Sequence, residues 1–105
     1  MFTPRVSNEH TTRLINALLA LSTTENASRF LEDVLTVQEL NSISQRVSVA
    51  HLLLNKTKYS DIVKETGAST ATISRVNRCL QYGANGYQLA LCSTPQSDSI
   101  TENEE

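Results

Sequence analysis

The sequence predicts an all-α fold of about six helices, and its low glycine and proline content is the first observation that indicates this class. The chain has 105 residues with three glycines and two prolines, and residues 5–94 contain no proline. β-Sandwiches and barrels need both residue types at their many turns, so this composition favours helices. Helical spacing of the apolar residues is the second observation. The length fits one helical domain, predicted over residues 1–91.

A wide apolar face marks the first expected helix, which runs from near Ser7 to about Leu21. Its apolar residues are Leu14, Ile15, Ala17, Leu18, Leu19 and Leu21. A second helix, starting at Thr23 or Thr24, carries Ala27, Phe30, Leu31, Val34 and Leu35. A short chain buries a limited share of its surface, so these faces predict the interface of a homodimer. A compact bundle that covers them within one chain is the alternative.

The third expected helix opens at Thr36 with a capping box. In this motif the Thr36 hydroxyl accepts a hydrogen bond from the backbone N–H of Glu39, and the Glu39 carboxylate reaches back to the start of the helix. Apolar residues then repeat at helical spacing as far as Leu54, and residues 55–57 are expected to end the helix. Residues 8–54 are thus predicted to supply the core and dimerisation helices.

Two short helices with a tight joint are expected over residues 57–82. Residues 59–66 form the first, with Thr57 as its expected cap, and Gly67 suits the left-handed position at its end. Ser69 is the expected N-cap of the second helix.

The chain beyond this pair of helices divides at Cys92. Gly83 is expected to end the second helix of the pair, and residues 84–91 to form one last short helix. Residues 92–105 are polar and acidic. Such a segment buries too little apolar surface to order itself, so it predicts a disordered acidic tail.

Helix, glycine turn and helix is typical of a helix-turn-helix. The residues expected to pack inward are Ile62, Val63, Ile73, Val76 and Leu80, with the small Ala71 allowing close approach. The residues left facing outward are Ser69, Thr70, Ser74, Asn77 and Arg78. Short polar side chains at the N-terminal half of a helix suit contact with base edges and phosphates. A plain αα-hairpin with a polar outer face is the alternative.

The charge distribution along the chain favours a nucleic-acid partner, although the net charge is −2. Residues 44–82 hold six basic and two acidic residues, a net charge of +4, whereas residues 1–43 carry −2 and residues 83–105 carry −4. The basic residues are Arg46, Lys56, Lys58, Lys64, Arg75 and Arg78. Positive charge concentrated on a helix-turn-helix favours phosphate contacts. Simple solvation of a helical surface is the alternative.

Four stretches in and around the expected helix-turn-helix match a known pattern. They are QRVSVAHLL at 45–53, YSDI at 59–62, GASTATISRVNRCL at 67–80 and YGANGY at 82–87. In these residues the chain resembles the Trp repressor superfamily, and within it the TrpR-like YerC/YecD branch, over about residues 8–91. The resemblance implies an intertwined homodimer of six-helix chains, with two recognition helices contacting successive major grooves of double-stranded DNA.

The same resemblance assigns residues to the DNA. It implies that base edges are approached by Ser69, Thr70, Ala71 and Ser74, and the phosphate backbone by Lys58, Lys64 and Thr72. The long polar side chains that the family carries in its first short helix are replaced here by Ser60 and Val63. The target sequence therefore cannot be carried over from the family.

An amino-acid effector is also implied by the resemblance. Arg46 and Arg75 match the two arginines that hold L-tryptophan in tryptophan-binding repressors, where a guanidinium binds the carboxylate and stacks on the ring. Those repressors have glycine beneath the indole at the next position. Here it is Val76, whose isopropyl group would take up part of the indole space. A phosphate contact for Arg75 and an ion pair for Arg46 are the alternatives.

The sequence offers no support for an enzyme, a metal site or a membrane protein. His10 and His51 lie far apart, Cys79 and Cys92 lack metal-ligand spacing, and no phosphate-binding loop or nucleophile motif is present. The two cysteines are expected as small buried or helix-end thiols in a reducing cytoplasm. No stretch has the pattern of a membrane span or secretory signal.

The sequence thus predicts a cytoplasmic, sequence-specific DNA-binding regulator, expected to repress transcription. A dimeric protein-interaction module without DNA binding is the alternative.

Overall fold

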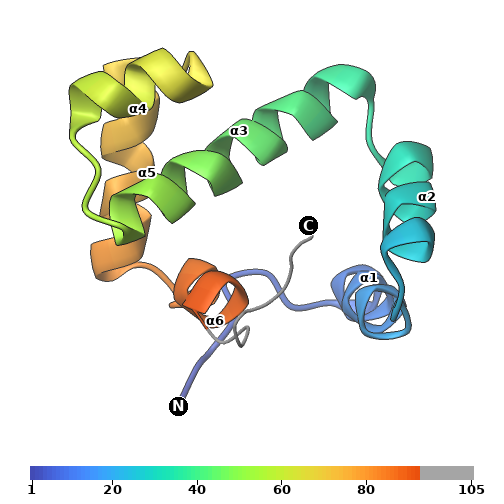
Figure 1. The fold of residues 1–105 in the computed structure, drawn as a ribbon. Coiled ribbons are helices and arrows are strands. Elements are labelled where there is room, and N and C mark those ends of the chain that lie inside the picture. Colours follow the sequence, from blue (N-terminus) through green and yellow to red (C-terminus); the bar gives the residue numbers. More distant parts are fainter. Residues whose placement is uncertain (93–105) are drawn as a thin grey trace. The chain divides into compact units, whose positions relative to one another are not determined.

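The computed structural model describes residues 1–92, which form six α-helices and no strand (Figure 1). The helices are α1 (Glu9–Leu19), α2 (Thr24–Val34), α3 (Val37–Leu54), α4 (Tyr59–Thr66), α5 (Thr70–Tyr82) and α6 (Gly86–Cys92). The predicted all-α class with about six helices is confirmed. Of the predicted acidic tail, Cys92 belongs to α6 and the rest lies outside the described residues. Within the described residues, no helix is long and apolar enough to cross a membrane.

The chain divides into two compact units, one over Met1–Asn41 and one that begins at Ser42. The first contains α1, α2 and the first turn of α3, and the second contains the rest of α3 with α4, α5 and α6. The single helical domain predicted over residues 1–91 stays a prediction.

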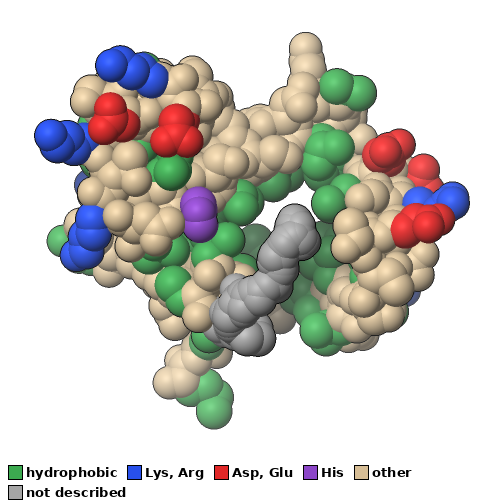
Figure 2. Space-filling view, viewed as in Figure 1, with side chains coloured by type: hydrophobic (Ala, Val, Ile, Leu, Met, Phe, Trp, Pro, Cys, Tyr) green, Lys and Arg blue, Asp and Glu red, His purple; other side chains and the backbone are tan. Residues whose placement is uncertain are grey.

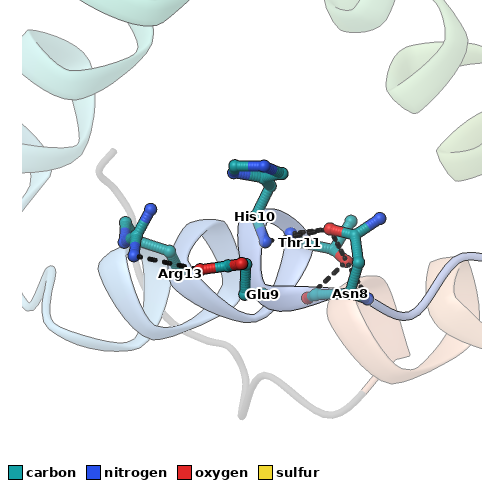
Figure 3. A network of polar contacts seen from close by, with 5 residues as sticks. All are labelled: Asn8, Glu9, His10, Thr11 and Arg13. Carbon is teal, nitrogen blue, oxygen red and sulfur yellow. Dashed lines mark hydrogen bonds and ion pairs between the residues drawn. The ribbon is translucent and has the colours of Figure 1, made fainter.

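A reciprocal cap starts α1 in the first unit (Figure 3). The Asn8 Oδ1 atom accepts hydrogen bonds from the backbone N–H groups of His10 and Thr11 at 2.9 and 3.0 Å. In return, the Thr11 hydroxyl accepts one from the Asn8 backbone N–H at 3.0 Å. These bonds satisfy amide groups that a helix start leaves unpaired, so α1 begins at Glu9, close to the start expected near Ser7.

The ends of α1 and α2 follow local capping chemistry. The chain leaves α1 at Ala20, so the helix stops two residues short of the predicted Leu21. α2 starts at Thr24, one of the two predicted positions, and Thr23 is its N-cap. The Thr23 hydroxyl accepts a hydrogen bond from the Asn26 backbone N–H at 3.1 Å. The expected capping box of α3 is also present. Thr36 N–H donates to Glu39 Oε1 at 2.8 Å, and Glu39 N–H donates to the Thr36 hydroxyl at 3.0 Å.

The first unit lacks a buried core. None of the residues Met1–Asn41 is buried, and hydrophobic side chains reach its surface (Figure 2). The exposed large hydrophobic residues of α1 are Leu14, Ile15, Leu18 and Leu19, and those from the end of α2 to the start of α3 are Val34 and Val37. Such a surface is typical of an element that another chain covers.

The second unit has a small core around the helix-turn-helix. Its buried residues are Val49, Ala50, Ile62, Ala68, Ile73 and Val76. They come from α3, α4, the turn and α5, and Leu52, Leu53, Val63, Leu80, Tyr87 and Leu91 pack against them. The inward positions predicted for the two short helices are confirmed. This core fixes α4 and α5 against α3 and so sets which side chains of α5 face outward.

Two local expectations about the second unit are wrong. Thr57 does not cap α4: the N-cap is Lys58, which makes no side-chain cap bond, because the chain is still turning out of α3 at Thr57. Ala71 is exposed, and the small buried residue at the joint is Ala68. Cys79 and Cys92 are free, exposed thiols near the ends of α5 and α6, which agrees with the helix-end alternative expected for them.

Close backbone approach explains why Gly83 ends α5. A Cβ atom at this position would stand 2.5 Å from the Cys79 carbonyl oxygen, which a side chain cannot tolerate. The next helix starts at Gly86 rather than at the predicted residue 84, because Asn85 has a left-handed backbone with φ +66°. The Gln88 side chain ties α6 to the end of α5 by donating to the Leu80 carbonyl at 2.6 Å.

Candidate nucleic-acid interface

The turn between α4 and α5 is held by a side-chain network as well as by its glycine. Gly67 has φ +72°, the left-handed conformation expected at this position, and its N–H donates to the Val63 carbonyl at 2.9 Å. The Thr66 hydroxyl donates to the Ile62 carbonyl at 2.7 Å and accepts from the Ala68 N–H at 3.1 Å. Together these bonds fix the angle at which α5 leaves α4.

A second tie to this turn comes from α3. The Gln45 side chain, on α3, donates from Nε2 to the Thr66 carbonyl at 3.1 Å. The bond joins residues 21 positions apart in the sequence. It satisfies a carbonyl that the end of α4 leaves without a helical partner. Gln45 and Thr66 were not predicted as site residues, and no spacing rule would have indicated the bond, because it depends on how α3 and α4 pack.

The predicted N-cap of α5 is confirmed, and it occupies two of the candidate DNA-contacting hydroxyl groups. The Ser69 hydroxyl accepts a hydrogen bond from the Thr72 backbone N–H at 3.1 Å and donates to the Thr72 hydroxyl at 3.1 Å. Thr72 is half-buried. Both groups are therefore engaged in starting the helix, and they are less suited to DNA contact than their neighbours.

The outer face of α5 carries the remaining candidates. We define this face by its exposed residues Thr70, Ala71, Ser74, Arg75 and Arg78. Within the described part of the chain, none of their side chains makes a hydrogen bond or ion pair. Ile73 and Val76 hold the opposite side of the helix in the core. The packing therefore presents two short polar groups and two arginines on one side of a fixed helix.

The charges of the two units are arranged differently. In the first unit Arg13 pairs with Glu9 (Figure 3), and Arg29 pairs with Glu25 at 2.7 Å. In residues 42–92 no basic side chain has an ion-pair partner among the described residues, including the predicted contacts Lys58 and Lys64. Figure 2 shows Lys and Arg side chains projecting from the surface over α4 and α5. Unpaired cations on a helix-turn-helix suit phosphate groups.

The two arginines predicted to hold an effector are both exposed in the second unit. Arg46 lies on α3 and Arg75 on α5, and neither has an ion-pair partner in the described residues. The ion pair considered for Arg46 is therefore absent there. Val76, beside Arg75 in the chain, is 2% exposed and belongs to the core. Its side chain fills core space rather than leaving room next to Arg75.

Residues 9–94 match the sequence model of the Trp repressor protein family. The chain belongs to the Trp repressor family. Within it, the uncharacterized protein YerC of Bacillus subtilis (strain 168) is 44% identical over 87 residues, which cover 83% of this chain and 84% of YerC. The predicted resemblance to the YerC branch of the Trp repressor family is confirmed.

Solved structures of Trp-repressor-like proteins share the fold. A TrpR like protein from Eubacterium eligens ATCC 27750 has a TM-score of 0.80 and 42% identity, covering 88% of this chain and 95% of that one. A candidate Trp repressor from Staphylococcus aureus has a TM-score of 0.79 and 40% identity, covering 83% and 87% of the two chains. The Trp repressor family is one of helical DNA-binding regulators and not of enzymes, which agrees with the class predicted from the sequence.

Proposed function

We propose that this protein is a sequence-specific DNA-binding repressor that acts as a homodimer. The observation that carries the proposal is the outer face of α5, fixed by the core behind it and accompanied by basic side chains without ion-pair partners in the described residues. In a helix-turn-helix the second helix enters the major groove while the first crosses the backbone. Thr70, Ala71 and Ser74 would then approach base edges, and Arg75, Lys58 and Lys64 phosphates.

Dimerisation supports this function through geometry. A two-fold dimer presents two copies of α5 to half-sites about one helical turn of DNA apart, which doubles the contacts with one operator. The apolar side chains of the first unit, none of which is buried, supply a surface that a second copy could cover. Occlusion of a promoter by such a dimer would make the protein a repressor.

Salt dependence is the first test of this function. DNA fragments selected from a random pool should bind the full chain with an affinity that falls about 10³-fold between about 50 and 200 mM salt, because six or more phosphate contacts release counterions. Fluorescence anisotropy on a labelled selected fragment measures the affinity at each salt concentration. The salt slope is the slope of log affinity against log salt concentration. Failure to retain any DNA at about 50 mM salt, where phosphate contacts are strongest, would refute the proposal.

Effector control is the second test, and we expect L-tryptophan not to bind. The side chain of Val76 is 2% exposed and fills core space at the position where tryptophan-binding repressors have glycine beneath the indole. Calorimetric titration of the protein with L-tryptophan should give no saturable heat, and DNA affinity should be the same with and without it. A saturable signal that Arg75→Ala removes would contradict this expectation and restore the effector role of Arg46 and Arg75.

A further inference from the structure

Lys56, at the end of α3, has a backbone conformation that lysine rarely adopts. Its φ is +66°, in the left-handed region. Its N–H donates to the Leu53 carbonyl at 3.0 Å, and the Thr57 N–H donates to the Leu52 carbonyl at 3.0 Å. This pair of bonds is the Schellman motif, whose left-handed position is usually glycine because a Cβ atom is disfavoured there. The sequence therefore places a long cationic side chain where the backbone favours glycine.

Contacts among the described residues do not offset the free-energy cost of the left-handed backbone at Lys56. The Lys56 side chain is exposed, and among the described residues it has no hydrogen bond or ion pair. A cation near the end of a helix gains some energy from the helix dipole, but at an exposed site this gain is smaller than the cost of a left-handed backbone. Lysine at position 56 thus lowers the stability of the folded chain. This indicates that its ammonium group serves a contact with another molecule.

The place of Lys56 in the fold indicates what that use is. It lies two residues before Lys58, the N-cap of α4, and α4 is the first helix of the helix-turn-helix. The first helix of this motif lies across the DNA backbone. We propose that Lys56 is a phosphate contact of the helix-turn-helix, held in a left-handed conformation for its charge. The proposal rests on the DNA-binding function proposed above.

Lys56→Gly in the full chain separates the binding role from a structural one, because the two expected effects run in opposite directions. Glycine relieves the left-handed strain, so the thermal midpoint should rise by about 4 °C. Loss of the cation should weaken DNA binding about 5-fold at about 100 mM salt, and reduce the salt slope by about 0.9 for each copy of the chain on the DNA. Calorimetry and anisotropy on a selected DNA fragment measure the two effects.

Asn85→Gly is the matched control. Asn85 is the other non-glycine residue with φ +66° among the described residues, and it is uncharged. This variant should also raise the thermal midpoint, while DNA affinity and salt slope stay as in the wild type. Lys56→Asn adds a neutral side chain that tolerates the left-handed region, and it should weaken DNA binding as Lys56→Gly does.

The outcomes distinguish this proposal from the function on which it rests. Salt-sensitive DNA binding by the wild type, with an unchanged affinity and slope in Lys56→Gly, would overturn the phosphate contact and leave the proposed function standing. A fall in the thermal midpoint of Lys56→Gly would overturn the claim that the charge is held at a cost to the fold. Absence of DNA binding by the wild type would overturn both proposals.

Discussion

Thr70→Glu is expected to lower DNA affinity at least about 100-fold at about 100 mM salt. Thr70 is the first residue of α5 and is exposed, with no hydrogen bond from its side chain in the described residues. In the proposed complex this position enters the major groove, where a carboxylate would meet phosphates and base acceptors of the same polarity. The fold should be unaffected, because an acidic residue in the first turn interacts favourably with the helix dipole. Anisotropy titration and a thermal melt measure the two properties.

Thr24→Glu provides a matched control for this prediction. Thr24 is likewise an exposed threonine at the first position of a helix, α2, but it lies in the first unit. It should leave DNA affinity within about 2-fold of the wild type, since α2 has no part in the proposed interface. Equal affinity of Thr70→Glu and the wild type for the same fragment would place the DNA elsewhere than on the outer face of α5. Absence of DNA binding by the wild type and the variant alike would instead favour a dimeric protein-interaction module.

Most of the fold could be predicted because its determinants are local. The Thr36–Glu39 capping box, the Ser69 cap and the left-handed Gly67 each involve backbone groups three or four residues apart. A pattern of residue types at that spacing therefore carries the whole interaction. The inward positions of α5 follow from helical periodicity in the same way.

The parts that could not be predicted depend on packing between helices. Gln45 reaches Thr66 across 21 positions, and nothing in its neighbours indicates that bond. Ala68 rather than Ala71 is buried at the joint, because the angle set at Gly67 decides which small residue meets α3 and α4. The cost at Lys56 is also invisible in the sequence, since lysine follows many helices and only the backbone angle shows that this one is left-handed.

The candidate site also has features that local sequence patterns predict and features that they do not. Its outward residues Thr70, Ser74 and Arg78 could be placed from periodicity, and the structure leaves them exposed as expected. Asn77, expected to face outward with them, is instead half-buried. Periodicity could not show that the Ser69 hydroxyl donates to the Thr72 hydroxyl at the start of α5, which makes both less suited to DNA contact than their neighbours. The absence of ion pairs around the basic residues in the described second unit could likewise not be predicted, because Asp61 and Glu65 lie close to Lys64 in the sequence.

A homodimer interface on the first unit predicts a large effect from Leu19→Glu. The Leu19 side chain is 79% exposed in the single chain. If the chain worked as a monomer, glutamate there would cost almost nothing. In a two-fold interface the change acts twice, removing about 1.5–3 kcal/mol of apolar burial per leucine and adding two carboxylates without partners. We therefore expect the dissociation constant of the dimer to rise at least about 100-fold, measured by sedimentation velocity over a range of concentrations.

Asn16→Glu separates this effect from a change in α1 itself. Asn16 is exposed in the second half of the same helix, but helical spacing places it off the apolar face formed by Ile15, Leu18 and Leu19. Asn16→Glu adds the same charge to the same helix but outside the apolar face, so the dimer should persist. Loss of the dimer in Leu19→Glu should also weaken DNA binding, because each operator half-site would then be bound by a separate chain. Wild type and Leu19→Glu sedimenting alike as monomers would instead favour a single-chain bundle, with the apolar side chains of α1 covered in some other way.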